Sequence, residues 1–151
     1  MRTFESEATI ARSADEVWSY AADIKRHSEW MSVADARILQ GDGTQVGARG
    51  RERMVLGPFK WDVEFEVTEA LPGRRIVWRA ADDSDGEFEV GLDLDATGPT
   101  TTRAMYHRGV QLHGAWRLLA PLLAMEGASG VRRELQRLKE KVEAASAAAA
   151  T

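Results

Sequence analysis

The sequence predicts an α+β fold in which a curved antiparallel sheet of seven strands wraps around a long C-terminal helix. Apolar and polar residues alternate through residues 2–11 and again through most of 33–110, as in strands that bury one face. From residue 120 onward the apolar residues recur at three- and four-residue steps, which indicates an amphipathic helix. The helix is the only segment long enough to cover the apolar face of such a sheet.

The first strand leads directly into a capped helix. The strand face that we expect to be buried carries Phe4, Ser6, Ala8 and Ile10. The following "SADE" has Ser13 at the N-cap position and Glu16 three residues later, which is the pattern of a capping box. Apolar residues then fall on one helical stripe as far as Ile24, so a helix of about three turns is predicted.

A second, shorter helix is predicted at "KRHSEW", and it ends at Trp30 and Met31. Two interpretations of these apolar residues stay open. They form a lip over a cavity, or Trp30 fills the core between helix and sheet.

Six further strands follow, joined mostly by short turns with glycine or proline. Alternation is clearest in "FKWDVEFEVTEAL", where Trp61, Val63 and Phe65 share the inward face. In "ARGRERM" we expect Glu52 and Met54 to point inward, because the opposite register would bury three arginines. These arginines then face the acidic row of the next strand and pair with it across the strands.

The C-terminal helix is predicted to span 120–146, and it completes a single domain of residues 1–146. The alanine-rich segment 147–151 is expected to fray. Gly127 and Gly130 are poor helix formers, and we expect them to permit a close approach to the sheet or a bend.

Composition excludes several functional classes. The net charge of −4 argues against nucleic acid as a partner, because phosphate binding requires a basic face. The chain has no cysteine and only three histidines, none at a helical i, i+4 spacing, so no metal site is predicted. No cofactor motif is present. The N-terminus does not resemble a signal peptide and no apolar run approaches about 20 residues, so we expect a cytoplasmic protein without membrane insertion.

The segments "ATIARSADEVWSYAADIKRHSEW", "VTEALPGRRIVWRA" and "APLLAMEGASGVRRELQRLKEKVE" resemble the opening, central hairpin and closing helix of the START-like (SRPBCC) superfamily. The resemblance is to its polyketide cyclase/dehydrase and lipid-transport family in particular. It implies a helix-grip fold with a hydrophobic cavity, and a pocket entrance beside the second short helix. Ser13 is a departure, because many members have proline there. The resemblance is specific for fold and says little about reaction, since the superfamily includes cyclases, carriers and lipid-transfer modules.

The inward faces of the strands and helices supply the candidate ligand-binding residues. They are mainly aromatic and aliphatic, as expected for a small-molecule cavity. The predicted set is Trp30, Met31, Met54, Trp61, Val63, Phe65, Trp78, Phe88, Val90, Leu122 and Met125.

Glu52, Tyr106 and Arg108 are the polar candidates inside this apolar set. Cyclisation or dehydration of a poly-β-ketone needs a base and donors for the enolate oxygen. Glu52 is the candidate base, and Tyr106 and Arg108 are the candidate donors. The alternative is structural: Glu52 and Arg108 form an ion pair at the rim, and Tyr106 fills the core.

Three functions therefore stay open. The first is binding of a small hydrophobic, partly oxygenated ligand such as a lipid, an aromatic compound or a polyketide. The second is a cyclase, aromatase or dehydratase that uses the same cavity. The third is a protein-interaction module with a vestigial pocket. Aromatic residues on the inner face favour the first two, and the sequence leaves open whether the protein is a monomer or a homodimer.

Overall fold

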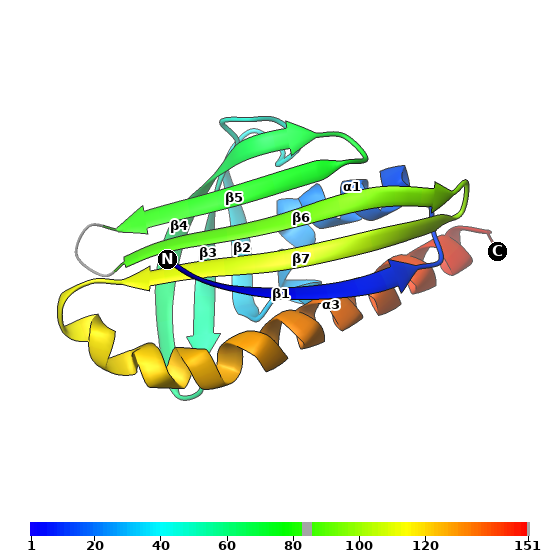
Figure 1. Ribbon diagram of the computed structural model, residues 1–151. Helices are drawn as coiled ribbons and strands as arrows, with labels where there is room; N and C mark the ends of the chain where they lie inside the picture. The colour runs from blue at the N-terminus through cyan, green and yellow to red at the C-terminus, as the bar shows by residue number, and fades with distance from the viewer. Residues whose placement is uncertain (83–85, 151) are drawn as a thin grey trace.

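The computed structural model describes residues 1–82 and 86–150 of the chain (Figure 1). Its elements follow in the order β1 (Arg2–Ile10), α1 (Ala14–Ala22), η1 (Ile24–Arg26), α2 (His27–Trp30), β2 (Val33–Gln40), β3 (Arg49–Leu56), β4 (Phe59–Leu71), β5 (Arg75–Asp82), β6 (Gly86–Gly98), β7 (Thr101–Leu112), η2 (Gly114–Leu119) and α3 (Ala120–Ala150). The short segments η1 and η2 are 3₁₀ helices. The predicted α+β fold is confirmed, and α3 extends four residues beyond its predicted end. Fraying of 147–151 stays a prediction.

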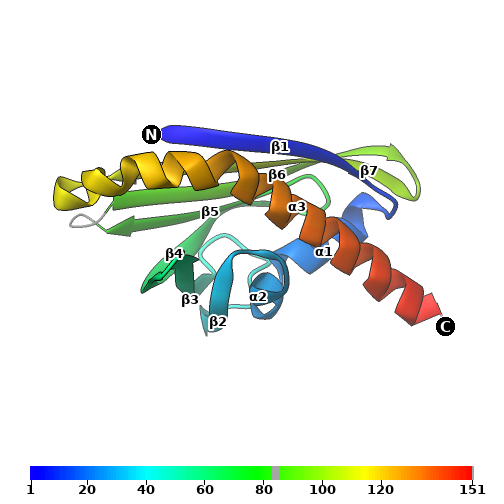
Figure 2. The same cartoon turned by 90° about the horizontal axis from the view of Figure 1, so that it is seen from below.

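The seven strands form one antiparallel sheet in the order β1-β7-β6-β5-β4-β3-β2. The first two strands of the chain therefore lie at opposite edges of the sheet. Register shifts interrupt the pairing of β2 with β3, of β4 with β5 and of β6 with β7. Such irregularities increase the local twist and bend of a sheet, and Figure 2 shows β2, β3 and β4 curving away from the other strands.

Helix α3 crosses the concave face of the sheet and packs chiefly against β1 (Figure 2). Its apolar stripe is buried there, with Val131, Leu135, Leu138 and Val142 at 2% exposure or less. A Cβ atom at Gly127 would lie 2.5 Å from the Phe4 ring. Gly127 thus permits the close approach to the sheet that the sequence predicts.

Helix α1 begins as predicted, because Ser13 Oγ accepts a hydrogen bond from the Glu16 backbone N–H at 3.2 Å. Trp18 on this helix donates through Nε1 to the Arg75 carbonyl at 3.0 Å. Helix α1 is therefore fixed against the start of β5, and the chain continues into η1 and α2 below the sheet.

Ion pairs between side chains connect β3 and β4 on the outer face of the sheet. Arg49 pairs with Glu64 at 3.1 Å and Arg53 pairs with Asp62 at 3.0 Å. The predicted cross-strand pairing is confirmed, and with it the inward direction of Glu52 and Met54.

Candidate functional site

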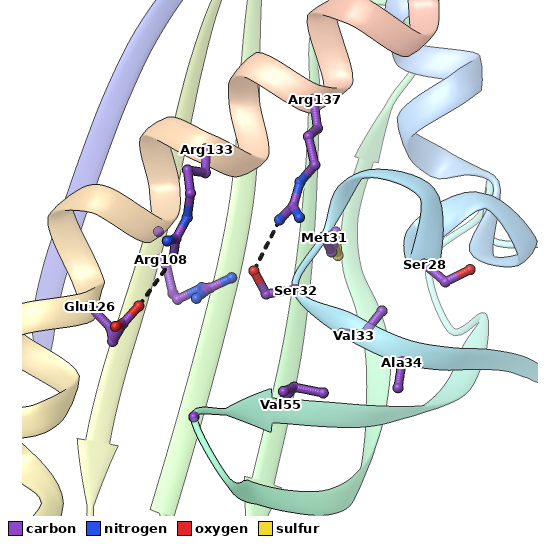
Figure 3. Close-up of a pocket in the computed structure, with 12 residues that line it drawn as sticks. Ser28, Met31, Ser32, Val33, Ala34, Val55, Arg108, Glu126, Arg133 and Arg137 are labelled. Carbon is purple, nitrogen blue, oxygen red and sulfur yellow. Dashed lines mark hydrogen bonds and ion pairs between the residues drawn. The ribbon is translucent and has the colours of Figure 1, made fainter.

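The space between α3 and the curved sheet contains a groove of about 490 Å³ (Figure 3). One wall comes from α3, with Arg108 of β7 beside it, and the opposite wall comes from the end of α2, the start of β2 and the end of β3. The residues that line it are Ser28, Met31, Ser32, Val33, Ala34, Val55, Gly57, Arg108, Glu126, Gly130, Arg133 and Arg137. The groove is therefore apolar on the β2 side and rich in arginine on the α3 side.

A second, inner cavity lies deeper against the sheet and measures about 40 Å³. This volume holds only a few water molecules, since a cavity needs roughly 10–15 Å³ for one. Its lining residues are His27, Met31, Glu52, Met54, Val63, Phe65, Trp78, Arg79, Ala80, Phe88 and Val90. The structure thus brings seven of the predicted ligand-binding residues, together with Glu52, around one small apolar space.

Met31 lines both the groove and the inner cavity. It follows Trp30 at the end of α2 and is 6% exposed. The thioether of methionine is flexible and fits irregular gaps. Met31 therefore borders both spaces, at the position where the sequence suggests a lip.

Four predicted residues lie elsewhere than at these two spaces. Trp30 is completely buried, and its ring centroid lies 5.5 Å from that of Tyr106, so it belongs to the core and does not form a lip. Met125 is 78% exposed, because this first part of α3 directs it away from the sheet. Trp61 and Leu122 are partly buried, and neither lines the groove or the inner cavity.

Glu52 is 8% exposed and pairs with His27, a buried histidine that is not among the predicted site residues. His27 Nδ1 lies 2.5 Å from Glu52 Oε1, and His27 Nε2 lies 3.0 Å from the Ala21 carbonyl oxygen. A carbonyl only accepts, so Nε2 carries a proton. His27 lies three residues after Ile24 and three before Trp30, and this shared helical face is the signal that marks it.

Arg108 pairs with Glu134 of α3, and not with Glu52 as the structural alternative proposes. Glu134 is completely buried, and its Oε2 accepts a hydrogen bond from the Ser32 backbone N–H at 2.7 Å. Glu134 lies three residues after Val131, within the apolar stripe of α3. A carboxylate at that position indicates a buried partner of opposite charge.

Tyr106, Arg108 and Glu134 shift one another's pKa values. Burial raises the pKa of Tyr106, and the Glu134 carboxylate adds to that effect, so the phenol stays protonated. Burial acts to lower the pKa of Arg108, but Glu134 and Tyr106 outweigh it and the net pKa is raised. Burial raises the pKa of Glu134 against the opposing effects of Arg108 and the Ser32 amide.

The three polar candidates share one region but not one surface. Glu52 lines the inner cavity, Arg108 lines the groove, and Tyr106 is completely buried between β7 and Trp30. Within the described residues, no three histidine or acidic side chains gather to hold a metal ion. None of the described helices combines the length and apolar character that crossing a bilayer requires.

Residues 1–143 match the family described as polyketide cyclase/dehydrase and lipid transport. The match covers nearly the whole chain. The chain belongs to this family. No curated protein matches it.

Solved structures with the same fold match this chain over nearly its whole length. A protein of Thermus thermophilus superposes with a TM-score of 0.80 at 19% identity, over 96% of this chain and 99% of that one. The Zhui aromatase/cyclase of a Streptomyces species superposes with a TM-score of 0.76 at 15% identity, over 94% of this chain and 93% of that one. A START superfamily protein of Mycobacterium smegmatis superposes with a TM-score of 0.73 at 15% identity, over 93% of this chain and 97% of that one. At these sequence identities the structural similarity shows a shared fold and does not show a shared function.

Proposed function

We propose that the protein binds a small apolar molecule with an oxygenated end between α3 and the sheet. The observation that carries the proposal is that the groove and the inner cavity both have Met31 as a lining residue, so the two spaces adjoin at this side chain. The groove volume of about 490 Å³ falls within the roughly 300–1,000 Å³ typical of ligand sites. Family membership supports a hydrophobic ligand.

The apolar body of the ligand extends from the groove toward the inner cavity. Val33 and Val55 supply the apolar wall of the groove, and Phe65, Trp78 and Phe88 supply aromatic surface farther in. Entry requires rotation of the Met31 side chain, which has three rotatable bonds and repacks readily. Burial of each methylene group contributes about 0.8 kcal/mol to binding.

Binding of 1-decanol, measured by isothermal titration calorimetry, tests this proposal. Met31→Ala joins the two spaces and should tighten binding. Val90→Phe fills the inner cavity and should weaken binding about tenfold or more, because part of the chain then stays in water. Leu39→Phe is the control, since Leu39 is 48% exposed on β2. Native mass spectrometry of freshly purified protein should also detect a copurified small molecule.

The proposal fails if 1-decanol does not bind the wild-type protein. It also fails if Val90→Phe and Leu39→Phe bind the alcohol equally, because the inner cavity then takes no part.

A second candidate function is cyclisation or dehydration of a ketone-rich substrate in the same space. The observation that favours it is the 2.5 Å contact of His27 with Glu52 at the wall of the inner cavity. Such a pair can take a proton from an acidic carbon, with Glu52 as the base and His27 holding it in place. Arg108 at the groove and the protonated Tyr106 are the candidate donors to the enolate oxygen.

Glu52→Gln and Arg108→Met separate catalysis from binding. Both variants should weaken binding or turnover of an oxygenated ligand, while the fold, followed by circular dichroism, is retained. Arg108→Met should also lower the melting temperature, because it leaves the buried Glu134 without its ion-pair partner. Loss of turnover of a poly-β-ketone analogue in Glu52→Gln with unchanged affinity would favour the enzyme. Unchanged affinity and turnover in both variants would reject the roles proposed for Glu52 and Arg108.

A further inference from the structure

We infer that the groove receives a carboxylate group of the ligand and that Arg137 binds it. This inference rests on the proposed function, and it specifies the chemistry of the oxygenated end: a monocarboxylic acid on an apolar body.

The groove has more positive than negative charge. Three of its lining residues are arginines, Arg108, Arg133 and Arg137. Arg108 is paired with the buried Glu134, and Arg133 is paired with Glu126 at 3.0 Å. For Arg137, no carboxylate of the described residues lies within the 4.0 Å of an ion pair. Arg137 thus has no ion-pair partner at contact distance. The Glu134 carboxylate also interacts with its charge, but Glu134 is already bonded to Arg108 and to the Ser32 amide.

The hydrogen bonding of Arg137 is also incomplete. Within the described residues its side chain makes a single hydrogen bond, from Nη2 to Ser32 Oγ at 3.1 Å, while its Nε is buried without a partner. A guanidinium has five N–H donors in a planar fork, which matches a carboxylate in two parallel hydrogen bonds. Buried donors without acceptors cost free energy, so a ligand carboxylate at this position satisfies both the charge and the donors.

The helix presents this arginine to open space. Arg133 and Arg137 lie one turn apart on α3. Arg137 projects toward Ser32, just before β2, whereas Arg133 is turned toward Glu126 (Figure 3). Gly130, one turn earlier, leaves the groove without a side chain: a Cβ atom there would meet only Arg108 Nη1, at 3.9 Å. The glycine therefore keeps the groove open beside the arginines.

The wall opposite the arginines is apolar and determines the orientation of the ligand. Val33, Ala34 and Val55 line the groove on the side away from α3 (Figure 3). A carboxylate at Arg137 places the rest of an amphipathic molecule along this wall, toward Met31 and the inner cavity. A monoanion suits the site better than a dianion, because one positive charge is unpaired and the Glu126 and Glu134 carboxylates repel further negative charge.

Calorimetric titration of decanoate, 1-decanol and decyl phosphate tests the inference on the wild type, Arg137→Gln and Arg132→Gln. The wild type should bind decanoate about tenfold or more tightly than 1-decanol, the difference expected for a charge-assisted pair. Arg137→Gln should remove that preference, because decanoate then loses its ion pair and binds no more tightly than 1-decanol. Arg132→Gln is the matched control, because Arg132 is an exposed arginine of the same helix outside the groove.

Salt dependence gives a readout that needs no variant. Decanoate binding should weaken as sodium chloride is raised, relative to 1-decanol, because an ion pair in an open groove is screened. Thermal unfolding establishes whether Arg137→Gln folds, and Arg137→Lys should retain part of the preference for decanoate.

The outcomes separate this inference from the proposed function. If neither decanoate nor 1-decanol binds, the proposed function fails. If both bind with equal affinity and equal salt dependence, or if Arg137→Gln keeps the preference for decanoate, the carboxylate site is overturned and the apolar cavity stands. Tighter binding of decyl phosphate than of decanoate would overturn the assignment to a carboxylate.

Discussion

Glu134 holds three parts of the molecule together through one side chain. Its two oxygens accept hydrogen bonds from Arg108 on β7 and from the Ser32 amide after α2, while its own backbone belongs to α3. Arg108 is 20% exposed and Glu134 is completely buried, so water screens their interaction little. The pair therefore sets the distance between α3 and the sheet beside the groove.

Glu134→Gln should destabilise the protein by about 3 kcal/mol, because it leaves the Arg108 guanidinium buried without an opposite charge. Urea unfolding followed by tryptophan fluorescence measures the change. Glu126→Gln is the control: it breaks the exposed pair with Arg133, for which a loss within about 1 kcal/mol is expected. Equal losses in the two variants would contradict the structural role of Glu134.

At the scale of elements, the packing of α3 depends on where its glycines lie. Gly127 faces the Phe4 ring on β1 at a distance that excludes any side chain, whereas Gly130 faces open groove. The two positions are three residues apart in one helix, so helix propensity favours alanine equally at both. Only the contact with the sheet distinguishes them.

Gly127→Ala should therefore destabilise the protein by about 1–3 kcal/mol, the cost of overpacking. Gly130→Ala should stabilise it by up to about 1 kcal/mol through helix propensity. Melting temperatures of the two variants, each compared with the wild type, measure the difference. A rise in melting temperature for both would show that Phe4 moves aside without cost.

Periodicity predicts elements well and partners poorly. Alternation placed Glu52, Met54 and Phe65 on the inner face because each strand buries one side. The partners of the polar residues depend on contacts between distant segments, such as Glu134 with Arg108 or His27 with Glu52, and no local pattern encodes them. Met125 differs from its prediction because the stripe was extended into the first turns of α3, where this side chain is exposed.

At the scale of the whole molecule, the far end of α3 is attached to the end of β1. The Ala11 backbone N–H donates to Glu143 Oε2 at 3.2 Å, and Lys139 Nζ donates to the Thr9 carbonyl at 2.6 Å. Lys139 also pairs with Glu143 at 2.9 Å. These contacts fix the helix across the sheet just beyond the groove, on the C-terminal side of Arg137.

This attachment should depend on pH. Burial acts to raise the pKa of Glu143, but the bonds from Lys139 and Ala11 outweigh it and the net pKa is lowered. A lowered folded-state pKa means that the stabilisation is complete above the unfolded value of about 4.3 and is lost as pH falls through the folded value. Glu143→Gln should thus lower the melting temperature by about 2–4 °C at pH 7.

The difference between wild type and Glu143→Gln should shrink as the pH is lowered from 5 to 3. Glu140→Gln serves as the control, because Glu140 is exposed on the same helix. A difference that stays constant over this pH range would contradict the role of the Glu143 carboxylate.

The pairing of β1 with β7 joins Arg2 to Val110 and Ile10 to Thr102. During synthesis the ribosome releases this N-terminal strand long before its neighbour exists, since about a hundred residues must be added first. The nascent chain therefore carries an unpaired strand until β7 has been made, exposed to association with other chains. Completion of the sheet waits for this contact between segments distant in sequence, and such contacts form slowly.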